Sequence, residues 1–150
     1  MNSSRTAVSA ELGLGLVGPE RTIVPLMASL YYTAVNPYEI RMAFHVGTDE
    51  PVEWALSRDL LAAARYAREG IGDVQAWPSI ASCDPAAGTD PEVAEILNIA
   101  MTSPFGAAQF EMSARAMEDF LQRTFRLVPA GSESVYFDFD AELTELLSQA

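Results

Sequence analysis

The sequence is poor in the residues that most chemical sites require. It has one cysteine, one histidine and no lysine, so all nine basic residues are arginines. A single cysteine, Cys83, excludes an internal disulfide and fits a reducing cytoplasm. No cysteine and histidine set is large enough to hold zinc, and no glycine-rich loop has phosphate-binding spacing. We therefore expect no metal and no cofactor, and we interpret the absence of lysine as a genomic composition bias.

Positive charge is also scarce. The chain has 21 acidic and 9 basic residues, for a formal net charge of −12. The first 75 residues hold nine acids and six arginines, whereas the second 75 hold twelve acids and three arginines. Such a surface repels a phosphate backbone, so no nucleic acid is expected as a partner. A basic protein patch or a regulatory partner fits this charge better.

Long apolar runs are missing as well. Residues 1–17 lack a continuous apolar segment and already alternate like a strand, so we expect neither a signal peptide nor direct membrane insertion. The length of 150 residues and the apolar share of 49% suit one domain, residues 1–150, with its own core. These features predict a cytoplasmic protein.

The stretch from 36 to 61 organises the predicted fold. Residues 40–46 and 52–56 each alternate between apolar and polar side chains, which predicts two antiparallel strands with one buried face. Ser57 follows where the period changes, and its hydroxyl suits the N-cap of a helix over residues 58–68. Gly70 and Gly72 are expected to stop this helix. The stretch predicts a sheet folded onto a helix.

The other elements follow from the same patterns. Further strands are predicted over residues 8–16, 26–33, 73–77, 96–102 and 107–112. Residues 92–102 also fit a helix, although we prefer the strand over 96–102. The composition of residues 79–91 predicts a loop. Ser113 is expected to cap the longest helix, over 114–127, and Asp140 a final short helix that follows an extended stretch over 133–139.

Two details concern surfaces. Gly13 and Gly15 fall on the outer face of the first strand, which indicates strong twist or close approach of another backbone. The second strand is apolar on both faces, which predicts that a helix or another subunit covers part of it. Residues 53–58 and 110–115 both run from a strand through a serine cap into a helix. They suggest two similar halves, each a sheet followed by a helix.

The side chains that could carry chemistry favour structural interpretations. His45 is the one histidine that a Ser–His or Cys–His pair could use, and Cys83 has no cation beside it in the sequence to lower its pKa. The acids at 138, 140 and 142 lack the spacing of a calcium loop, and those at 49, 50 and 53 flank a turn. Aromatic residues at strand spacing usually face a core rather than stack on bases, which concerns Tyr31, Tyr32, Phe44, Trp54 and Trp77. We expect no enzyme.

An ordered set of short motifs covers nearly the whole chain. The first half carries Asn36-Pro37-Tyr38, Phe44-His45-Val46-Gly47, Val52-Glu53-Trp54, Arg58-Asp59-Leu60-Leu61, Gly72-Asp73-Val74 and Trp77-Pro78-Ser79. The second half carries Thr102-Ser103-Pro104, Ala114-Arg115-Ala116, Phe120-Leu121, Arg123-Thr124, Val128-Pro129 and Phe137-Asp138. Together they resemble the SsgA-like proteins of actinomycetes, with an SsgB-like branch as the nearest. The segment at about 79–95 departs from the pattern and is expected to be an inserted loop.

The resemblance implies a fold and a function. It implies an α+β, whirly-like fold, with antiparallel sheets each followed by a helix and packed around a helical core, assembled into a homo-oligomer, expected to be a trimer. It implies a non-enzymatic regulator or adaptor of sporulation-specific cell division at the septum, which helps to position the tubulin-like protein FtsZ directly or through another SsgA-like protein. The alternative is a single-stranded nucleic-acid-binding whirly-type module. Four residues are predicted to be structurally central or to contact a partner: Trp54, Arg58, Arg115 and Arg123.

Overall fold

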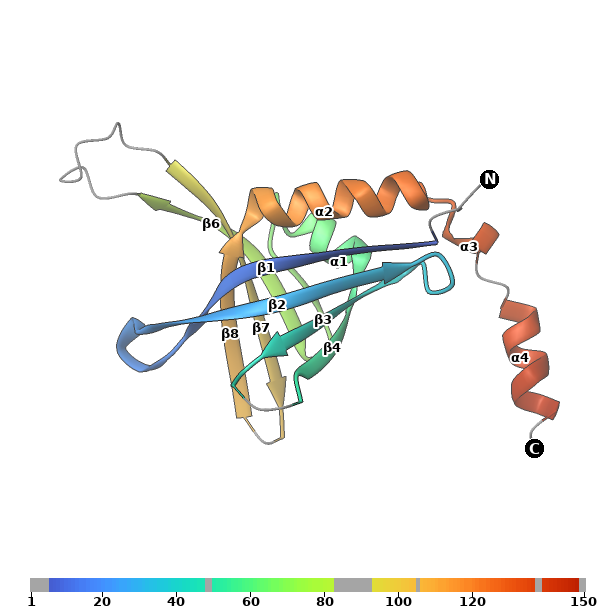
Figure 1. The fold of residues 1–150 in the computed structure, drawn as a ribbon, viewed down its shortest axis with the longest axis horizontal. Coiled ribbons are helices and arrows are strands. Elements are labelled where there is room, and N and C mark those ends of the chain that lie inside the picture. The colour runs from blue at the N-terminus through green and yellow to red at the C-terminus, as the bar shows by residue number, and fades with distance from the viewer. Residues whose placement is uncertain (1–5, 48–49, 83–92, 105, 137–138, 149–150) are drawn as a thin grey trace.

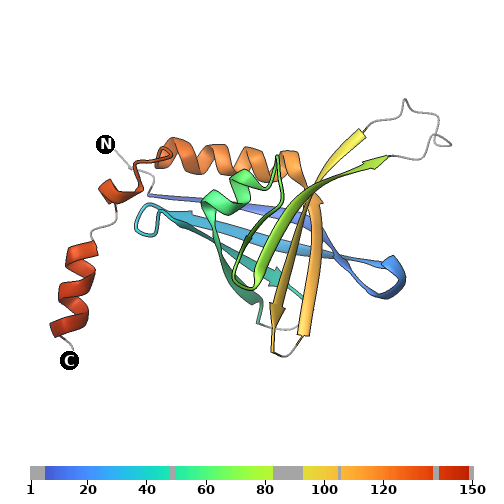
Figure 2. The same ribbon diagram turned by 180° about the vertical axis from the view of Figure 1, so that it is seen from behind.

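One antiparallel sheet of eight strands organises the computed structural model, which describes residues 6–47, 50–82, 93–104, 106–136 and 139–148 (Figures 1 and 2). The strands lie in the order β4-β3-β2-β1-β8-β7-β6-β5. Each half is a four-strand meander followed by a helix, α1 after β4 and α2 after β8. The predicted α+β class and the two similar halves are therefore confirmed. The expected separate sheets are wrong, because β1 pairs with β8 and joins the halves into one sheet.

The first meander begins with a long hairpin. Strand β1 (Ala7–Val17) pairs with β2 (Ile23–Thr33) over their full lengths, around the short 3-10 helix η1 (Pro19–Arg21). The second strand thus starts three residues before the predicted position. Only three residues of β1, Leu14 to Leu16, pair with β8, so the tip of the hairpin projects beyond the sheet (Figure 1).

Strands β3 (Glu39–His45) and β4 (Val52–Ser57) pair antiparallel, as predicted. The Ser57 hydroxyl accepts a hydrogen bond of 3.2 Å from the Leu60 amide, which confirms the predicted N-cap of α1 (Arg58–Ala63). This helix is shorter than predicted. Residues expected in its last turn lead instead into β5 (Glu69–Ile71), where pairing with the next strand replaces the helical hydrogen bonds. Gly72, at φ 58°, forms the turn between the two strands.

The second meander extends into the first residues of the segment predicted as a loop. Strand β6 (Val74–Ser82) continues past Pro78, and β7 (Val93–Ser103) pairs with it along its length. Pro78 is tolerated because β5 ends opposite Ala76, so β6 has a free edge there. The predicted end of the strand at residue 77 is wrong, and the strand interpretation of residues 96–102 is confirmed. The centre of the predicted insertion, including Cys83, lies outside the described residues.

Strand β8 (Gly106–Ser113) leads into α2 (Ala114–Leu127), whose bounds match the prediction. The Ser113 hydroxyl accepts a hydrogen bond of 3.1 Å from the Ala116 amide and caps the helix as expected. The buried stripe of α2 faces the same side of the sheet as α1 (Figures 1 and 2). It consists of Ala114, Met117, Phe120, Leu121 and Thr124.

The sheet is strongly curved around the core. Phe44 on β3 stacks on Phe110 on β8, with ring centroids 4.3 Å apart. Strands β3 and β8 are three places apart in the sheet, about 14 Å if it were flat. The contact therefore requires the two halves to fold toward each other, with α1 and α2 across one end of the hollow (Figure 1).

The C-terminal segment departs from the prediction. Residues 133–136 form helix α3 (Glu133–Tyr136) rather than an extended stretch. A local hydrogen bond of 3.1 Å from the Val135 amide to the Ser132 carbonyl supports this turn, and an ion pair of Glu133 with a residue distant in the sequence, described below, holds it in place. Helix α4 (Phe139–Ser148) already contains Asp140, so Asp140 does not cap it from outside.

Candidate protein-contact sites

The four predicted contact residues lie in four separate places. Trp54 lies on β4 at the open end of the hollow, and Arg58 is buried at the start of α1. Arg115 is exposed in the first turn of α2, and Arg123 is exposed near its end. The structure therefore does not combine them into one site, and each is described where it lies.

Arg58 is the centre of a buried cluster that joins α1, β2, α2 and α3. Its side chain is 1% exposed. One terminal nitrogen donates to the carbonyls of Thr124 at 3.2 Å and Val128 at 2.8 Å, which are acceptors at the end of α2. The guanidinium also lies 4.2 Å from the ring centre of Phe125 and 5.0 Å from that of Tyr32. The guanidinium therefore caps α2 and stacks between two rings.

Glu133 supplies the counter-charge of Arg58. Its Oε1 accepts a 2.8 Å hydrogen bond from the second terminal nitrogen of Arg58, and its side chain is 8% exposed. A hydrogen bond from its own backbone N–H, and then the bond from Arg58, hold the pKa of Glu133 below its usual value, although burial acts in the opposite direction. We call these four side chains, Arg58, Tyr32, Phe125 and Glu133, the Arg58 cluster. Its contacts assign Arg58 a structural role.

Arg65 and Arg123 make further links between elements. Arg65 pairs with Glu95 on β7 at 2.8 Å and with Glu118 on α2. Arg123 donates to the carbonyl of Ser9 on β1 at 3.2 Å. The sequence analysis missed Arg65 because its partners lie 30 and 53 positions away, and no local pattern indicates such pairing. Both arginines are partly or largely exposed, so each link stabilises the fold only modestly.

Trp54 lines an apolar cavity of about 320 Å³ at the open end of the hollow. Its walls come from both halves of the sheet, including Phe44 and Val52 on one side and Phe110 on the other. Val46 and Val52 are 40% and 47% exposed at its edge. We call this cavity the mouth. It offers a half-buried tryptophan beside exposed aliphatic side chains, which is the composition of an interaction hot spot.

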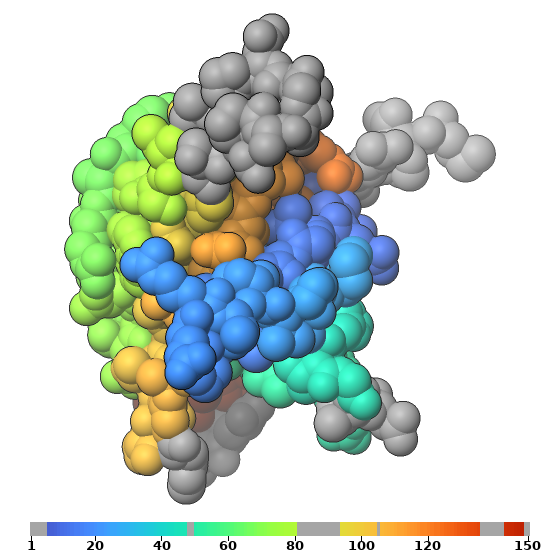
Figure 3. Space-filling view, turned by 90° about the vertical axis from the view of Figure 1, so that its left-hand side faces the viewer, coloured from blue at the N-terminus to red at the C-terminus, as the bar shows by residue number. Residues whose placement is uncertain are grey.

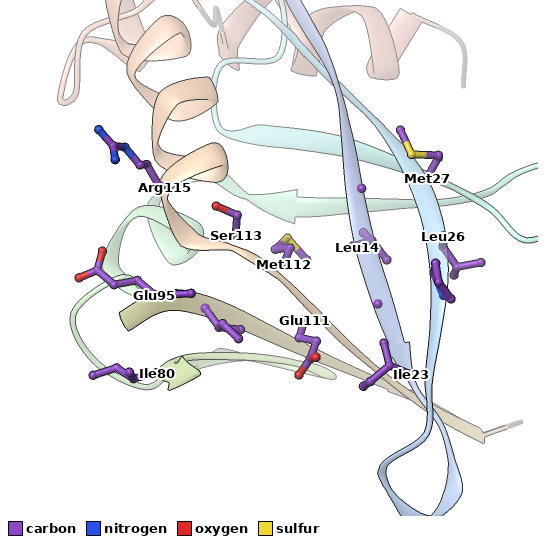
Figure 4. Close-up of a pocket in the computed structure, with 15 residues that line it drawn as sticks. Leu14, Ile23, Leu26, Met27, Ile80, Glu95, Glu111, Met112, Ser113 and Arg115 are labelled. Carbon is purple, nitrogen blue, oxygen red and sulfur yellow. The ribbon is translucent and has the colours of Figure 1, made fainter. Parts of the chain in front are cut away.

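A larger groove lies at the other end of the sheet, beside the start of α2. It has a volume of about 980 Å³ and runs between the β1–β2 hairpin and the β6–β7 hairpin (Figures 3 and 4). Its apolar walls include Ile23 and Met27 on β2 and Ile80 on β6, which are 46%, 47% and 70% exposed. We call this feature the groove. Ile23 and Met27 are exposed within this chain, so the predicted cover of the second strand by a helix is not seen at these residues, and cover by another subunit stays a prediction.

Two glycines and one arginine shape the groove. Gly13 and Gly15 on β1 line its floor, and a Cβ on Gly15 would lie 2.5 Å from the Cγ2 of Ile23. The close approach at Gly15 is made by the side chain of Ile23, not by another backbone as predicted. Arg115 borders the groove and has no hydrogen bond or ion pair among the described residues, whereas Glu111 lies across from it (Figure 4).

Among the side chains tested for chemistry, those that the structure describes are not gathered into a catalytic site, and Asp49, Cys83 and Asp138 lie outside the described residues. His45 Nε2 lies 2.9 Å from the Ser29 hydroxyl on the exposed outer face of the sheet. Within the described ranges, no group of three or more histidine, cysteine, aspartate or glutamate side chains is arranged to hold a metal ion. None of the helices in the described part of the chain has the length and apolar character that a membrane crossing requires.

The aromatic residues considered for base stacking mostly have protein neighbours. Tyr32 and Phe44 are each 1% exposed, so they belong to the core as predicted. The ring of Trp77 is covered by the guanidinium of Arg68 at 4.4 Å. Tyr31 remains 47% exposed on the outer face.

Comparison with known proteins gives one consistent family. Residues 26–133 match the family described as Streptomyces sporulation and cell division protein, SsgA. The sporulation-specific cell division protein SsgB of Thermobifida fusca is 47% identical over 148 residues, which is 99% of this chain and 100% of the relative. The SsgB of Streptomyces coelicolor is 40% identical over 145 residues, 97% of this chain and 98% of the relative.

Solved structures agree. A crystal structure of an SsgA-like sporulation-specific cell division protein from Thermobifida fusca superimposes with a TM-score of 0.78 at 47% identity and covers 97% of this chain and 98% of that one. A second structure superimposes with a TM-score of 0.77 at 39% identity. It covers 91% of this chain and 100% of that one. Its description states that mutations in SsgB correlate to longitudinal cell division during sporulation of Streptomyces coelicolor.

Proposed function

Because the chain belongs to the SsgA family of sporulation and cell division proteins, in its SsgB-like branch, we propose that it is a non-enzymatic adaptor of sporulation-specific cell division. The adaptor acts in the cytoplasm at the division septum through protein–protein contacts, and it positions FtsZ directly or through another SsgA-like protein. The observation that carries this proposal is the mouth, an apolar cavity with a half-buried tryptophan on an otherwise acidic chain.

The mouth has the properties of a contact site for a short apolar segment. Tryptophan is enriched among the residues that dominate binding energy, and exposed apolar side chains around a concave site favour a protein partner. Val52, Trp54 and Phe110 all line the mouth, so a partner side chain inserted there would contact both halves of the sheet. Trp54 thus acts in this proposal as the anchor for the division partner.

The proposed self-assembly is a homo-oligomer, with the trimer that the family resemblance implies. A protein that presents several equivalent contact sites binds a polymer such as FtsZ more tightly than a single site does, because later contacts form within one complex. The oligomer therefore gives the adaptor a role that a monomer would perform weakly.

The test is a quantitative pull-down of purified FtsZ, and separately of a purified SsgA-like relative, with the full chain. Trp54→Ala is expected to weaken binding at least about 30-fold, as truncation of a hot-spot residue does. Tyr66→Ala is the matched control, because Tyr66 is an exposed aromatic residue that does not line the mouth. Wild-type protein that binds neither bait, or Trp54→Ala protein that binds as wild type does, would contradict the proposal.

A further inference from the structure

The C-terminal helix α4 is an amphipathic helix that lies apart from the sheet (Figures 1 and 2). Every described side chain on it, from Leu143 to Ser148, is exposed. Leu143, Leu146 and Leu147 have the i, i+3, i+4 spacing of one apolar stripe, and the last two are 66% and 67% exposed. Ten residues form a marginal helix in water on their own, so the helix requires an apolar surface to be stable.

The groove is an apolar surface of suitable size. It is open and bordered by strands, and its walls expose Ile23, Met27 and Ile80. Gly13 and Gly15 line its floor without side chains, and Ile23 lies over Gly15. A ten-residue helix is about 15 Å long, and a groove of about 980 Å³ admits the leucine stripe of such a helix.

The contact between the two parts is apolar rather than ionic. At about 100° per residue, Glu145 lies roughly 150° around α4 from the middle of the leucine stripe, so it faces solvent when the leucines enter the groove. The groove is lined by one arginine, Arg115, and by two acids, Glu95 and Glu111. Burial of the leucine side chains is therefore the source of affinity.

The two parts cannot meet within one chain. Helix α4 follows α3 at the end of the molecule where α2 finishes, whereas the groove lies where α2 starts (Figures 1 and 2). A second copy of this chain can bring them together. Such a contact is heterologous, since a helix of one copy meets a different surface of the next, and it closes into a ring when the rotation between copies allows.

We propose that α4 of each copy docks in the groove of the next copy, with Leu143, Leu146 and Leu147 against Ile23, Met27 and Ile80. This inference rests on the homo-oligomer of the proposed function and names its contact. The ring then leaves the mouth of every copy free for the division partner, because the mouth lies on another part of the sheet from the groove.

Mixing two variants of the full chain tests this contact. The helix variant is Leu146→Asp with Leu147→Asp, and the groove variant is Met27→Asp. The matched control is Val35→Asp, which replaces an exposed apolar residue, 71% exposed, outside both parts. Light scattering and sedimentation equilibrium give the mass of each protein, and circular dichroism checks that each is folded. If Met27→Asp fails to fold, Ile80→Asp replaces it.

The expected result has three parts. Wild type and Val35→Asp form the same oligomer, and each variant alone is a monomer, with its association at least about 100-fold weaker. A 1:1 mixture of the two variants forms a heterodimer and nothing larger, because it contains one intact helix and one intact groove that can pair. A monomeric wild type, a helix variant with the wild-type mass, or a mixture without heterodimer would overturn the proposal.

The FtsZ pull-down separates this inference from the proposed function. Rings that assemble as described but bind neither FtsZ nor a relative leave the α4 contact standing and refute the adaptor function. Binding of FtsZ by a protein whose assembly ignores α4 refutes the contact and leaves the adaptor function standing.

Discussion

The two ends of α2 present opposite environments for an arginine. At the C-terminal end, Arg58 is enclosed by two rings, two backbone carbonyls and the carboxylate of Glu133. At the N-terminal end, Arg115 borders an open apolar groove and has no partner among the described residues. The helix is about 21 Å long, so the two environments belong to one rigid element.

The two environments indicate different roles, a structural one for Arg58 and a partner-contacting one for Arg115. Removing one partner of a buried ion pair destabilises the fold strongly, because the other charge is left buried and uncompensated. An exposed cation beside apolar surface adds little to the stability of the chain, but it orients a partner that covers the surface. Residue type alone therefore did not distinguish Arg58 from Arg115, whereas their neighbours do.

The largest effect is expected in the Arg58 cluster, at the C-terminal end of α2. Arg58→Met keeps much of the side-chain volume but removes the charge and leaves Glu133 and the end of α2 without their donor. The free energy of unfolding should fall by about 3–5 kcal/mol, as measured by urea denaturation followed by circular dichroism. Arg115→Met is the matched control and should change it by less than about 0.5 kcal/mol. Similar losses for the two variants would contradict the distinction between the ends.

Glu133→Gln tests the same cluster through pH. At neutral pH the variant should lose about 1.5–3 kcal/mol, the worth of a hydrogen bond between charged groups. The lowered pKa of Glu133 means that its carboxylate stabilises the folded state fully above the ordinary glutamate pKa, about 4.3. The contribution is lost as pH falls through the lowered pKa of the folded state.

Denaturation of wild type and Glu133→Gln from pH 7 to the lowest pH at which both fold gives the readout. The difference in unfolding free energy should stay constant down to about pH 4.3 and shrink below it. A difference that grows on acidification would show that the sign of the pKa shift is wrong.

A smaller effect is expected on the floor of the groove, at the N-terminal end of α2. Gly15→Ala places a Cβ 2.5 Å from the Cγ2 of Ile23 and forces that β-branched side chain from its position, at a cost of about 1 kcal/mol. Gly13→Ala is the matched control on the same face of β1, where the new Cβ lies 3.8 Å from the Met27 sulfur. The control should be neutral or slightly stabilising in thermal denaturation. Equal changes in thermal stability for the two variants would show that the contact between Gly15 and Ile23 is not tight.

Local patterns in the sequence were sufficient for much of the fold. Alternation of apolar and polar residues located β3 and β4, and the serine caps at 57 and 113 located the starts of α1 and α2. Both signals depend on residues that are close together in the sequence. The glycines at 13 and 15 predicted close approach of a backbone, whereas the side chain of Ile23 fills the space beside Gly15. Cover of the apolar outer face of β2 by another subunit stays a prediction.

Features that depend on distant partners were not predictable in this way. The strand β6 continues through Pro78 because its neighbour β5 is short, and the sequence does not reveal the length of a partner strand. Residues 133–136 form a helix at a position where Glu133 reaches Arg58, 75 positions earlier. The Arg58 cluster itself combines elements from β2 to α3, so Arg58 was predicted as central without its partners.

Disulfide trapping tests most directly whether α4 of another copy fills the groove at the N-terminal end of α2. Leu146→Cys in α4 and Met27→Cys in the groove are combined in a Cys83→Ser background, which removes the one native thiol. Mild oxidation should link copies into covalent oligomers that stop at the size of the native assembly, and neither single cysteine variant should do so. Protein that stays unlinked, or a link within one chain, would contradict this contact between copies.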